Sequence, residues 1–136
     1  VRAEHPVLGL PLAGWEPRRP VPPDHWRLIY LWASWIPACR DELPALAALA
    51  RGREGLTALA VARVDVLQTE DEIRKVFAGA GEGLWLDLDD GSAARAFRAE
   101  DLPRVYLVDP DGEVRYSGRG SEVETLRAAL QRWVQR

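Results

Sequence analysis

Cysteine and histidine are scarce in this chain. Cys39 is the only cysteine among 136 residues, and His5 and His25 are the only histidines. A single thiol cannot form an intramolecular disulfide, and it excludes a metal site of the multi-cysteine kind. Both histidines lie in a proline-rich N-terminal stretch without a partner at ligand spacing, so we interpret them as surface residues. We therefore expect no metal site, and the sequence indicates no other cofactor.

Long apolar runs and a strong excess of one charge are also lacking. No stretch approaches the roughly 18 consecutive apolar residues that span a bilayer. Acidic residues number 21 and basic residues 18, which gives a net charge of −3, and the basic side chains are scattered among acidic ones. This balance gives no electrostatic reason to expect a nucleic-acid partner or an anionic membrane surface.

The chain begins at Val1 instead of a methionine, which we interpret as the removal of an upstream segment. A cleaved signal peptide, a cleaved membrane anchor or experimental trimming would each explain this start. We expect any membrane anchor to lie in that removed segment.

Length and composition indicate a single globular domain over residues 1–136. Hydrophobic residues make up 47% of the chain and charged residues 29%, which is ordinary for a folded soluble protein. A chain of this length can bury a core without help from disulfides. Residues 1–25 contain six prolines, too many for a helix or a central strand. We expect an irregular lead-in there, with a short edge strand near Leu8–Leu12.

The rest of the chain predicts strands and helices in alternation. Apolar runs predict buried strands at Trp26–Trp32 and Leu56–Val66, separated by a helix from about Pro37 to Arg51 that is kinked at Pro44. The further predicted elements are a helix opened by a Thr69–Glu72 capping box, an ambiguous segment Trp85–Asp89, a helix capped by Ser92 and running to Phe97, a hairpin of Arg104–Asp109 and Glu113–Ser117, and a last helix opened by a Ser121–Glu124 capping box. This order predicts an α/β fold, with a central mixed sheet of four or five strands and helices on both faces.

The turn after the first strand is where we expect chemistry, because such turns present helix N-termini and exposed side chains. Residues 32–44 read WASWIPACRDELP. This stretch closely resembles the active site of the TlpA/ResA-type thiol–disulfide oxidoreductases, whose pattern is Trp-Ala-Ser-Trp-Cys-x-x-Cys-Arg-x-Glu-Leu-Pro. Leu102-Pro103 stands where that family carries its cis-proline. The resemblance implies a thioredoxin fold and an extracytoplasmic location, either periplasmic or membrane-anchored and facing outward.

The sequence departs from the family pattern at three positions. Ile36 replaces the attacking cysteine, whose thiolate is stabilised by the helix N-terminus. Tyr30 stands at the position of a buried acid that manages protons, and Arg104 follows the expected cis-proline in place of a small or polar residue. Together these departures favour natural divergence, since serine or alanine would be the usual choice for an engineered trap. An engineered Cys-to-Ile variant of an active reductase stays an alternative.

Cys39, at the position of the resolving cysteine, has two interpretations. It is either a small hydrophobic residue packed in the helix, which we favour, or a monothiol catalytic residue that forms mixed disulfides or a sulfenic acid. A resolving cysteine lies one turn inside the helix, where shielding raises its pKa and slows attack. Peroxidase chemistry is not expected, since the peroxiredoxin motif Pro-x-x-x-Thr-x-x-Cys would require proline and threonine at Trp32 and Ile36.

The apolar residues of the motif and of the cis-proline region predict a binding groove. In the family, the backbone beside the cis-proline pairs with an extended substrate segment. We expect Trp35, Ile36, Pro37, Leu102 and Pro103 to form a groove that binds a peptide or protein partner without redox chemistry. The alternative is that Trp35 packs locally. The two functional hypotheses are therefore a thioredoxin-fold binding module and a thiol–disulfide oxidoreductase that acts through Cys39.

Overall fold

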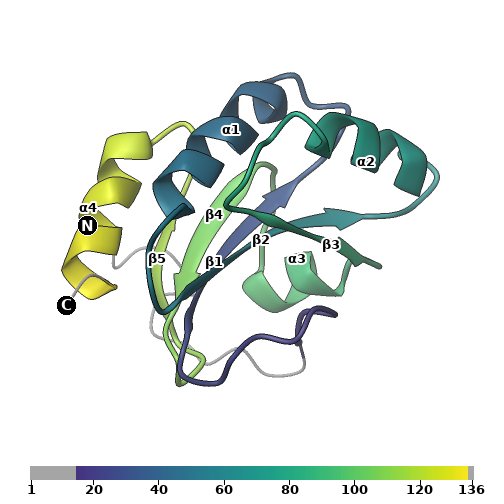
Figure 1. Cartoon of the computed structure of the whole chain (residues 1–136). Helices are drawn as coiled ribbons and strands as arrows, with labels where there is room; N and C mark the ends of the chain where they lie inside the picture. Colours follow the sequence, from purple (N-terminus) through teal and green to yellow (C-terminus); the bar gives the residue numbers. More distant parts are fainter. Residues whose placement is uncertain (1–14, 135–136) are drawn as a thin grey trace.

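The computed structural model describes residues 15–134, which form one five-stranded sheet covered by helices (Figure 1). Its elements are β1 (Trp26–Trp32), α1 (Ala38–Ala50), β2 (Leu56–Arg63), α2 (Glu70–Phe77), β3 (Trp85–Asp89), α3 (Ser92–Phe97), β4 (Arg104–Val108), β5 (Val114–Gly118) and α4 (Val123–Trp133). Residues 15–25 contain no helix or strand, as expected for the proline-rich lead-in. The expected edge strand near Leu8–Leu12 lies outside the described residues.

The sheet is mixed, with the strand order β3-β2-β1-β4-β5. Strands β1, β2 and β3 are parallel to one another, whereas β4 runs antiparallel to β1 and β5 antiparallel to β4. The central residue Ile29 therefore pairs with Leu59 on one side and with Tyr106 on the other. The predicted crossover and hairpin are confirmed, and so is the mixed sheet with helices on both faces.

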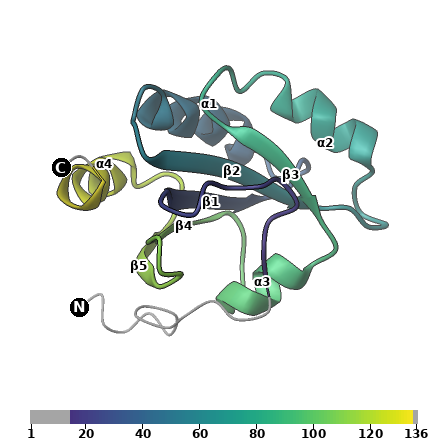
Figure 2. The same ribbon diagram turned by 60° about the horizontal axis from the view of Figure 1, so that its bottom comes forward.

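Two hydrophobic cores lie on opposite faces of the sheet (Figure 2). Successive side chains of a strand point to opposite faces, so Tyr30 of β1 joins one core and its neighbour Ile29 joins the other. The first core is covered by α1, α2 and α4. The second core is covered by α3 and by Trp15 from the lead-in. We call them the α1 core and the α3 core.

The predicted strand Leu56–Val66 is too long by three residues. The backbone N–H of Val64 still donates to the carbonyl of Asp89 at 2.9 Å, but Asp65 and Gln68 then pair across a tight reversal. Val66 is fully exposed on that reversal. The apolar residues that continued the pattern therefore belong to a loop. The other predicted bounds agree with the structure to within one or two residues.

Of the three predicted helix caps, only the first is confirmed. Thr69 and Glu72 form the capping box of α2, with both reciprocal hydrogen bonds present. Ser92 is instead the first residue of α3, and the carboxylate of Asp89 takes the capping role by accepting from the N–H groups of Gly91 at 2.9 Å and Ala93 at 3.1 Å. An acidic side chain at a helix start is favourable for the same reason as a serine cap.

The predicted Ser121–Glu124 capping box of the last helix is wrong. Helix α4 begins at Val123 after Glu122, without a side-chain cap. The N–H of Glu122 donates to the carbonyl of Arg119 at 3.0 Å, and its carboxylate accepts from the N–H of Arg119 at 2.9 Å. This local turn delays the helix by one residue relative to the sequence pattern.

Candidate functional site

The motif residues connect the carboxyl end of β1 to the first turn of α1. The N–H of Ile36 donates to the carbonyl of Ala33 at 3.2 Å, and the N–H of Cys39 donates to the carbonyl of Ile36 at 3.0 Å. Pro37 occupies the N-cap of α1 with φ −57°, a value that its ring imposes. Positions 36 and 39 therefore lie in one helical turn. Pro44 lies inside α1, as expected, and the kink there stays a prediction.

Cys39 is fully buried in the α1 core. Burial raises the pKa of its thiol, because the interior disfavours the thiolate. Hydrogen bonds with the Tyr30 side chain and the Ala33 backbone oppose this rise in pKa without cancelling it. The geometry agrees with a packed, weakly reactive thiol.

Tyr30 and Glu42 form a polar pair beside Cys39. The Tyr30 hydroxyl donates to Oε1 of Glu42 at 2.7 Å. Burial, with added contributions from Cys39 and Glu42, raises the pKa of Tyr30 so that its hydroxyl stays neutral. Gly120 lies against both side chains and leaves no room for a Cβ. The resemblance placed the family's buried acid at position 30, whereas the carboxylate found here is that of Glu42, in the same motif, which was not predicted.

Two of the five residues predicted to form one groove pack against different faces of the sheet. Ile36 is half-buried against the α1 core, whereas Leu102 packs against the α3 core. Trp35 is 58% exposed. A cavity of about 210 Å³ is lined by Trp35 and Leu102, but not by Ile36, Pro37 or Pro103. The cavity thus contains two of the five residues, and the groove as a partner site stays a prediction.

The region around Pro103 joins the cavity to β4. The Leu102–Pro103 peptide bond is cis. Arg104, the residue after it, is half-buried, and its Nη2 donates to Oγ of Ser117 on β5 at 3.1 Å. The guanidinium is thus held along the hairpin.

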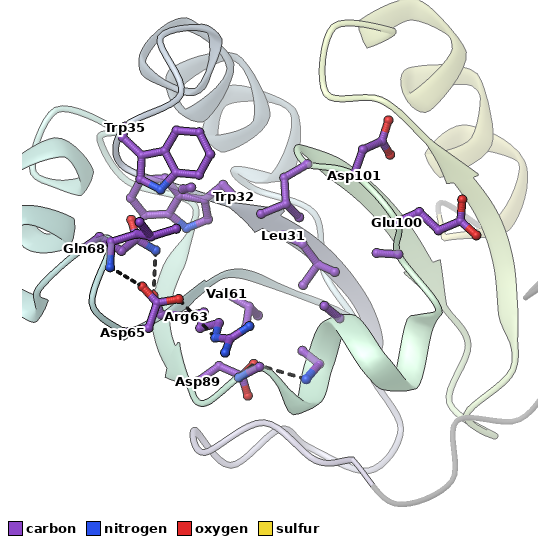
Figure 3. Close-up of a pocket in the computed structure, with 17 residues that line it drawn as sticks. Leu31, Trp32, Trp35, Val61, Arg63, Asp65, Gln68, Asp89, Glu100 and Asp101 are labelled. Carbon is purple, nitrogen blue, oxygen red and sulfur yellow. Dashed lines mark hydrogen bonds and ion pairs between the residues drawn. The ribbon is translucent and has the colours of Figure 1, made fainter.

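The cavity lies at the carboxyl ends of β1 and β2 and beside α3 (Figure 3). Its lining comes from four segments, within residues 31–35, 61–68, 89–94 and 99–102. Leu31, Val61 and Ala93 belong both to this lining and to the α3 core. Such a place, where parallel strands end, is where open α/β sheets commonly bind ligands.

Gln68 fixes the side of the cavity nearest Trp35. Its Oε1 accepts from both the N–H and the hydroxyl of Ser34 at 2.7 Å, and its Nε2 donates to the carbonyl of Arg63 at 2.6 Å. Although polar, Gln68 is only 4% exposed. It therefore ties the loop after β2 to the turn after β1. No periodicity marks a single loop glutamine, and the sequence analysis missed it.

Acidic side chains surround the cavity opening. Asp65, Glu100 and Asp101 line it together with a single basic residue, Arg63. Arg63 pairs with Asp65 at 3.1 Å. Arg119, from outside the lining, pairs with Asp101 at 2.8 Å and lowers the pKa of that carboxyl. Glu100 is exposed, and among the described residues it makes no ion pair.

Residues 15–134 contain neither a cluster of metal ligands nor a helix that could span a membrane. His25 is half-buried instead of surface-exposed, with Nδ1 at 2.9 Å from the Thr57 hydroxyl, while His5 lies outside the described part. Within that part, no three His, Cys, Asp or Glu side chains gather in a way that could hold a metal ion. None of its helices has the length and hydrophobicity needed to cross a bilayer.

We predict that Cys39 reacts slowly with a thiol reagent in the native protein. The thiolate is the reactive form, and burial both raises the pKa of Cys39 and blocks access to it. Labelling with a maleimide should therefore stay slow at pH 8, accelerate only above the ordinary thiol pKa of about 8.5, and become fast in 8 M urea. Rapid native labelling at pH 7 would show an activated thiolate.

Several solved structures are similar to this chain, although no family model and no curated protein matches it. A thioredoxin-like protein from Aeropyrum pernix has a TM-score of 0.71 at 17% identity, with 82% of this chain and 79% of that chain covered. The thioredoxin domain of a thiol–disulfide oxidoreductase from Bacteroides vulgatus gives 0.66 at 20% identity, with 82% and 80% covered. The exposed lipoprotein thioredoxin of Streptococcus pneumoniae gives 0.69 at 19% identity, with 80% and 85% covered. The chain therefore has a thioredoxin-like fold.

Proposed function

We propose that this thioredoxin-fold chain binds an extended peptide segment at the cavity beside Trp35 and does not run a dithiol–disulfide cycle. The observation that carries the proposal is the separation of the thiol from the open surface. Cys39 is fully buried, while Trp35 is 58% exposed at the mouth of an apolar-floored cavity. A surface of this kind buries an extended segment readily, whereas the thiol does not reach a partner.

The apolar surface extends beyond Trp35 into the loop after β2. Leu67 lines the same cavity and is 67% exposed, and Val66 beside it is fully exposed. Exposed aromatic and aliphatic side chains around a cavity are typical of peptide-binding surfaces. Gln68 fixes this loop to Ser34. The loop should therefore lose little conformational entropy when a peptide binds.

We further propose that the chain is a divergent member of the TlpA/ResA-type family and that Ile36 is its natural residue, not an engineered substitution. The motif WASWIPACRDELP supports this assignment. Catalysis by attack of one thiol and resolution by a second needs two cysteines in one helical turn, and this chain has one. An outward-facing, extracytoplasmic location follows from the same assignment, and it agrees with the exposed lipoprotein thioredoxin among the similar structures.

The oxidoreductase alternative would rely on Cys39 alone. A mixed disulfide on Cys39 would need an external thiol to resolve it, since the chain has no second cysteine. The buried thiol with a raised pKa argues against such a cycle. An activated thiolate in the labelling experiment above is the result that would favour this alternative.

We predict that replacing Trp35 with serine abolishes most of the peptide binding. Peptides of twelve residues selected on phage against the wild-type protein should lose affinity about tenfold or more, which is the effect of truncating one aromatic anchor. Trp85→Ser is the matched control, because Trp85 is 51% exposed on the edge strand β3 and does not line the cavity. Equal losses in the two variants, or no enriched peptide, would contradict the proposed function.

A further inference from the structure

The size of the cavity indicates what it receives. Its volume of about 210 Å³ lies below the range of roughly 300–1,000 Å³ that is common for drug-sized ligands. Leu31, Val61 and Ala93 give its floor few groups that could form hydrogen bonds with water. One large side chain is an occupant of the right size.

Trp32 adds a polar requirement to this apolar space. Trp32 lines the cavity and is 1% exposed, and its indole Nε1 is buried without a hydrogen-bond partner among the described residues. Figure 3 shows the Trp32 nitrogen on the edge of the ring that faces Asp65 and Val61. A buried donor without an acceptor is costly. An occupant with an acceptor oxygen at the end of an apolar body would remove that cost.

The charges at the opening favour a particular charge on the peptide residue next to the inserted side chain. Of the three carboxylates there, Asp65 is paired with Arg63 and Asp101 with Arg119. Glu100 is exposed, and no ion-pair partner is found for it within residues 15–134. This acidic opening disfavours a carboxylate side chain and attracts a cation. Glutamate and aspartate are therefore disfavoured as the inserted group.

We propose that the cavity binds the side chain of a tyrosine in an extended peptide, with a lysine or arginine next to that tyrosine. The inference rests on the proposed function and names its ligand class. The ring packs against Leu31 and Val61, the phenolic oxygen accepts a hydrogen bond from Nε1 of Trp32, and the neighbouring cation lies at Glu100. Methionine, which also fits an apolar space, is only a weak acceptor.

Four acetylated ten-residue peptides test the ligand. They are glycine–serine sequences that differ only at a central pair, Tyr-Lys, Phe-Lys, Tyr-Glu or Ser-Lys, and binding is measured by fluorescence anisotropy with a terminal dye. The Tyr-Lys peptide should bind most tightly. Loss of the hydroxyl should weaken binding about fivefold, and reversal of the neighbouring charge about tenfold, with the latter effect decreasing at high salt. Equal affinities of the Tyr-Lys and Phe-Lys peptides would overturn the proposal, as would free tyrosine amide binding as tightly as the Tyr-Lys peptide.

Two pairs of protein variants test the location. Ala94→Leu places a larger side chain in the cavity lining and should weaken Tyr-Lys binding about tenfold, whereas Ala96→Leu, on the same helix outside the lining, should not. Glu100→Lys should weaken binding, whereas Glu54→Lys makes the same charge change in the turn before β2, at the opposite end of the sheet. Both glutamates are exposed, so these two variants remain informative if Ala94→Leu fails to fold. Equal effects within the charge pair would overturn the location.

Failure of this inference is distinguishable from failure of the proposed function. Phage-selected peptides that bind through Trp35 but lack the Tyr-Lys pair, and that ignore Ala94→Leu, would overturn the tyrosine assignment alone. A selection that enriches no peptide would overturn the proposed function.

Discussion

We expect the Ile36→Cys variant to form an intramolecular disulfide with Cys39 under mild oxidation and to gain disulfide reductase activity above the wild-type background. Positions 36 and 39 lie in one helical turn, as the hydrogen bond from the N–H of Cys39 to the carbonyl of Ile36 at 3.0 Å shows. This spacing allows an acceptable disulfide geometry. The new thiol also lies at the N-terminus of α1, where the helix field lowers its pKa below about 8.5.

The restored activity should be weak. Tyr30 keeps its proton because burial raises its pKa, and the nearby Glu42 carboxylate already accepts a hydrogen bond from the Tyr30 hydroxyl at 2.7 Å. Arg104 follows the cis-proline, where the family has a small or polar residue next to the bound substrate, so we expect weaker substrate binding. Mass spectrometry counts the free thiols after oxidation, and insulin reduction with dithiothreitol measures turnover against the wild-type background.

Ala38→Cys is the matched control for this experiment. It adds one thiol to the same exposed helix terminus, but adjacent residues 38 and 39 do not form an unstrained disulfide. Two free thiols in oxidised Ile36→Cys would mean that the backbone of the turn no longer permits the bridge. Equal activity in both variants would assign the chemistry to an added thiol as such, instead of to the spacing.

Replacing Phe97 with alanine should lower the free energy of unfolding by about 3–5 kcal/mol. Phe97 is fully buried in the α3 core, stacks on Tyr106 with ring centroids 4.3 Å apart, and meets Trp15 edge-on at 5.7 Å. It therefore joins α3, the sheet and the lead-in at one point. Urea denaturation measures the loss as a lower midpoint at an unchanged slope.

Phe77→Ala is the comparison variant for stability. Phe77 is half-buried on α2 and faces Trp32 at a centroid distance of 6.5 Å. Because less apolar surface is buried there, its removal should cost clearly less than the removal of Phe97. Similar losses in the two variants would contradict the importance of the three-ring cluster.

The sequence predicted those features that depend on local pattern. The strand Trp26–Trp32 coincides with β1, and the Thr69–Glu72 capping box is present as expected, because an apolar run and a reciprocal cap are both complete within a few residues. The Ser92 cap failed for a local reason as well. Asp89, three residues earlier, competes for the same helix N–H groups, and the Ser92 hydroxyl donates to its Oδ1 at 2.9 Å.

The cavity beside Trp35 could not be predicted from the sequence, because periodicity does not say which face of the sheet an element covers. Ile36 and Leu102 are both half-buried apolar residues near the motif end of the sheet, but they pack against different cores. Leu102 joins the α3 core because α3 packs on that face of the sheet. The face that a helix covers depends on tertiary contacts and not on its local sequence. Gln68 and Glu42 were missed for a similar reason, since their roles rest on Ser34 and Tyr30, which are distant in sequence from each of them.

The placement of the two cores on opposite faces of the sheet has a consequence for sequence change. Cys39, Tyr30 and Ile36 belong to the α1 side, whereas Leu31, Val61 and Ala93 of the cavity belong to the α3 side, and Trp32 is shared by the α1 core and the cavity. Residues that share no partners usually have additive effects on stability. Substitutions of Ile36 or Cys39 should therefore leave the packing of Leu31, Val61 and Ala93 largely unchanged. In such a protein, residues on one face of the sheet can be substituted while the packing on the other face is conserved.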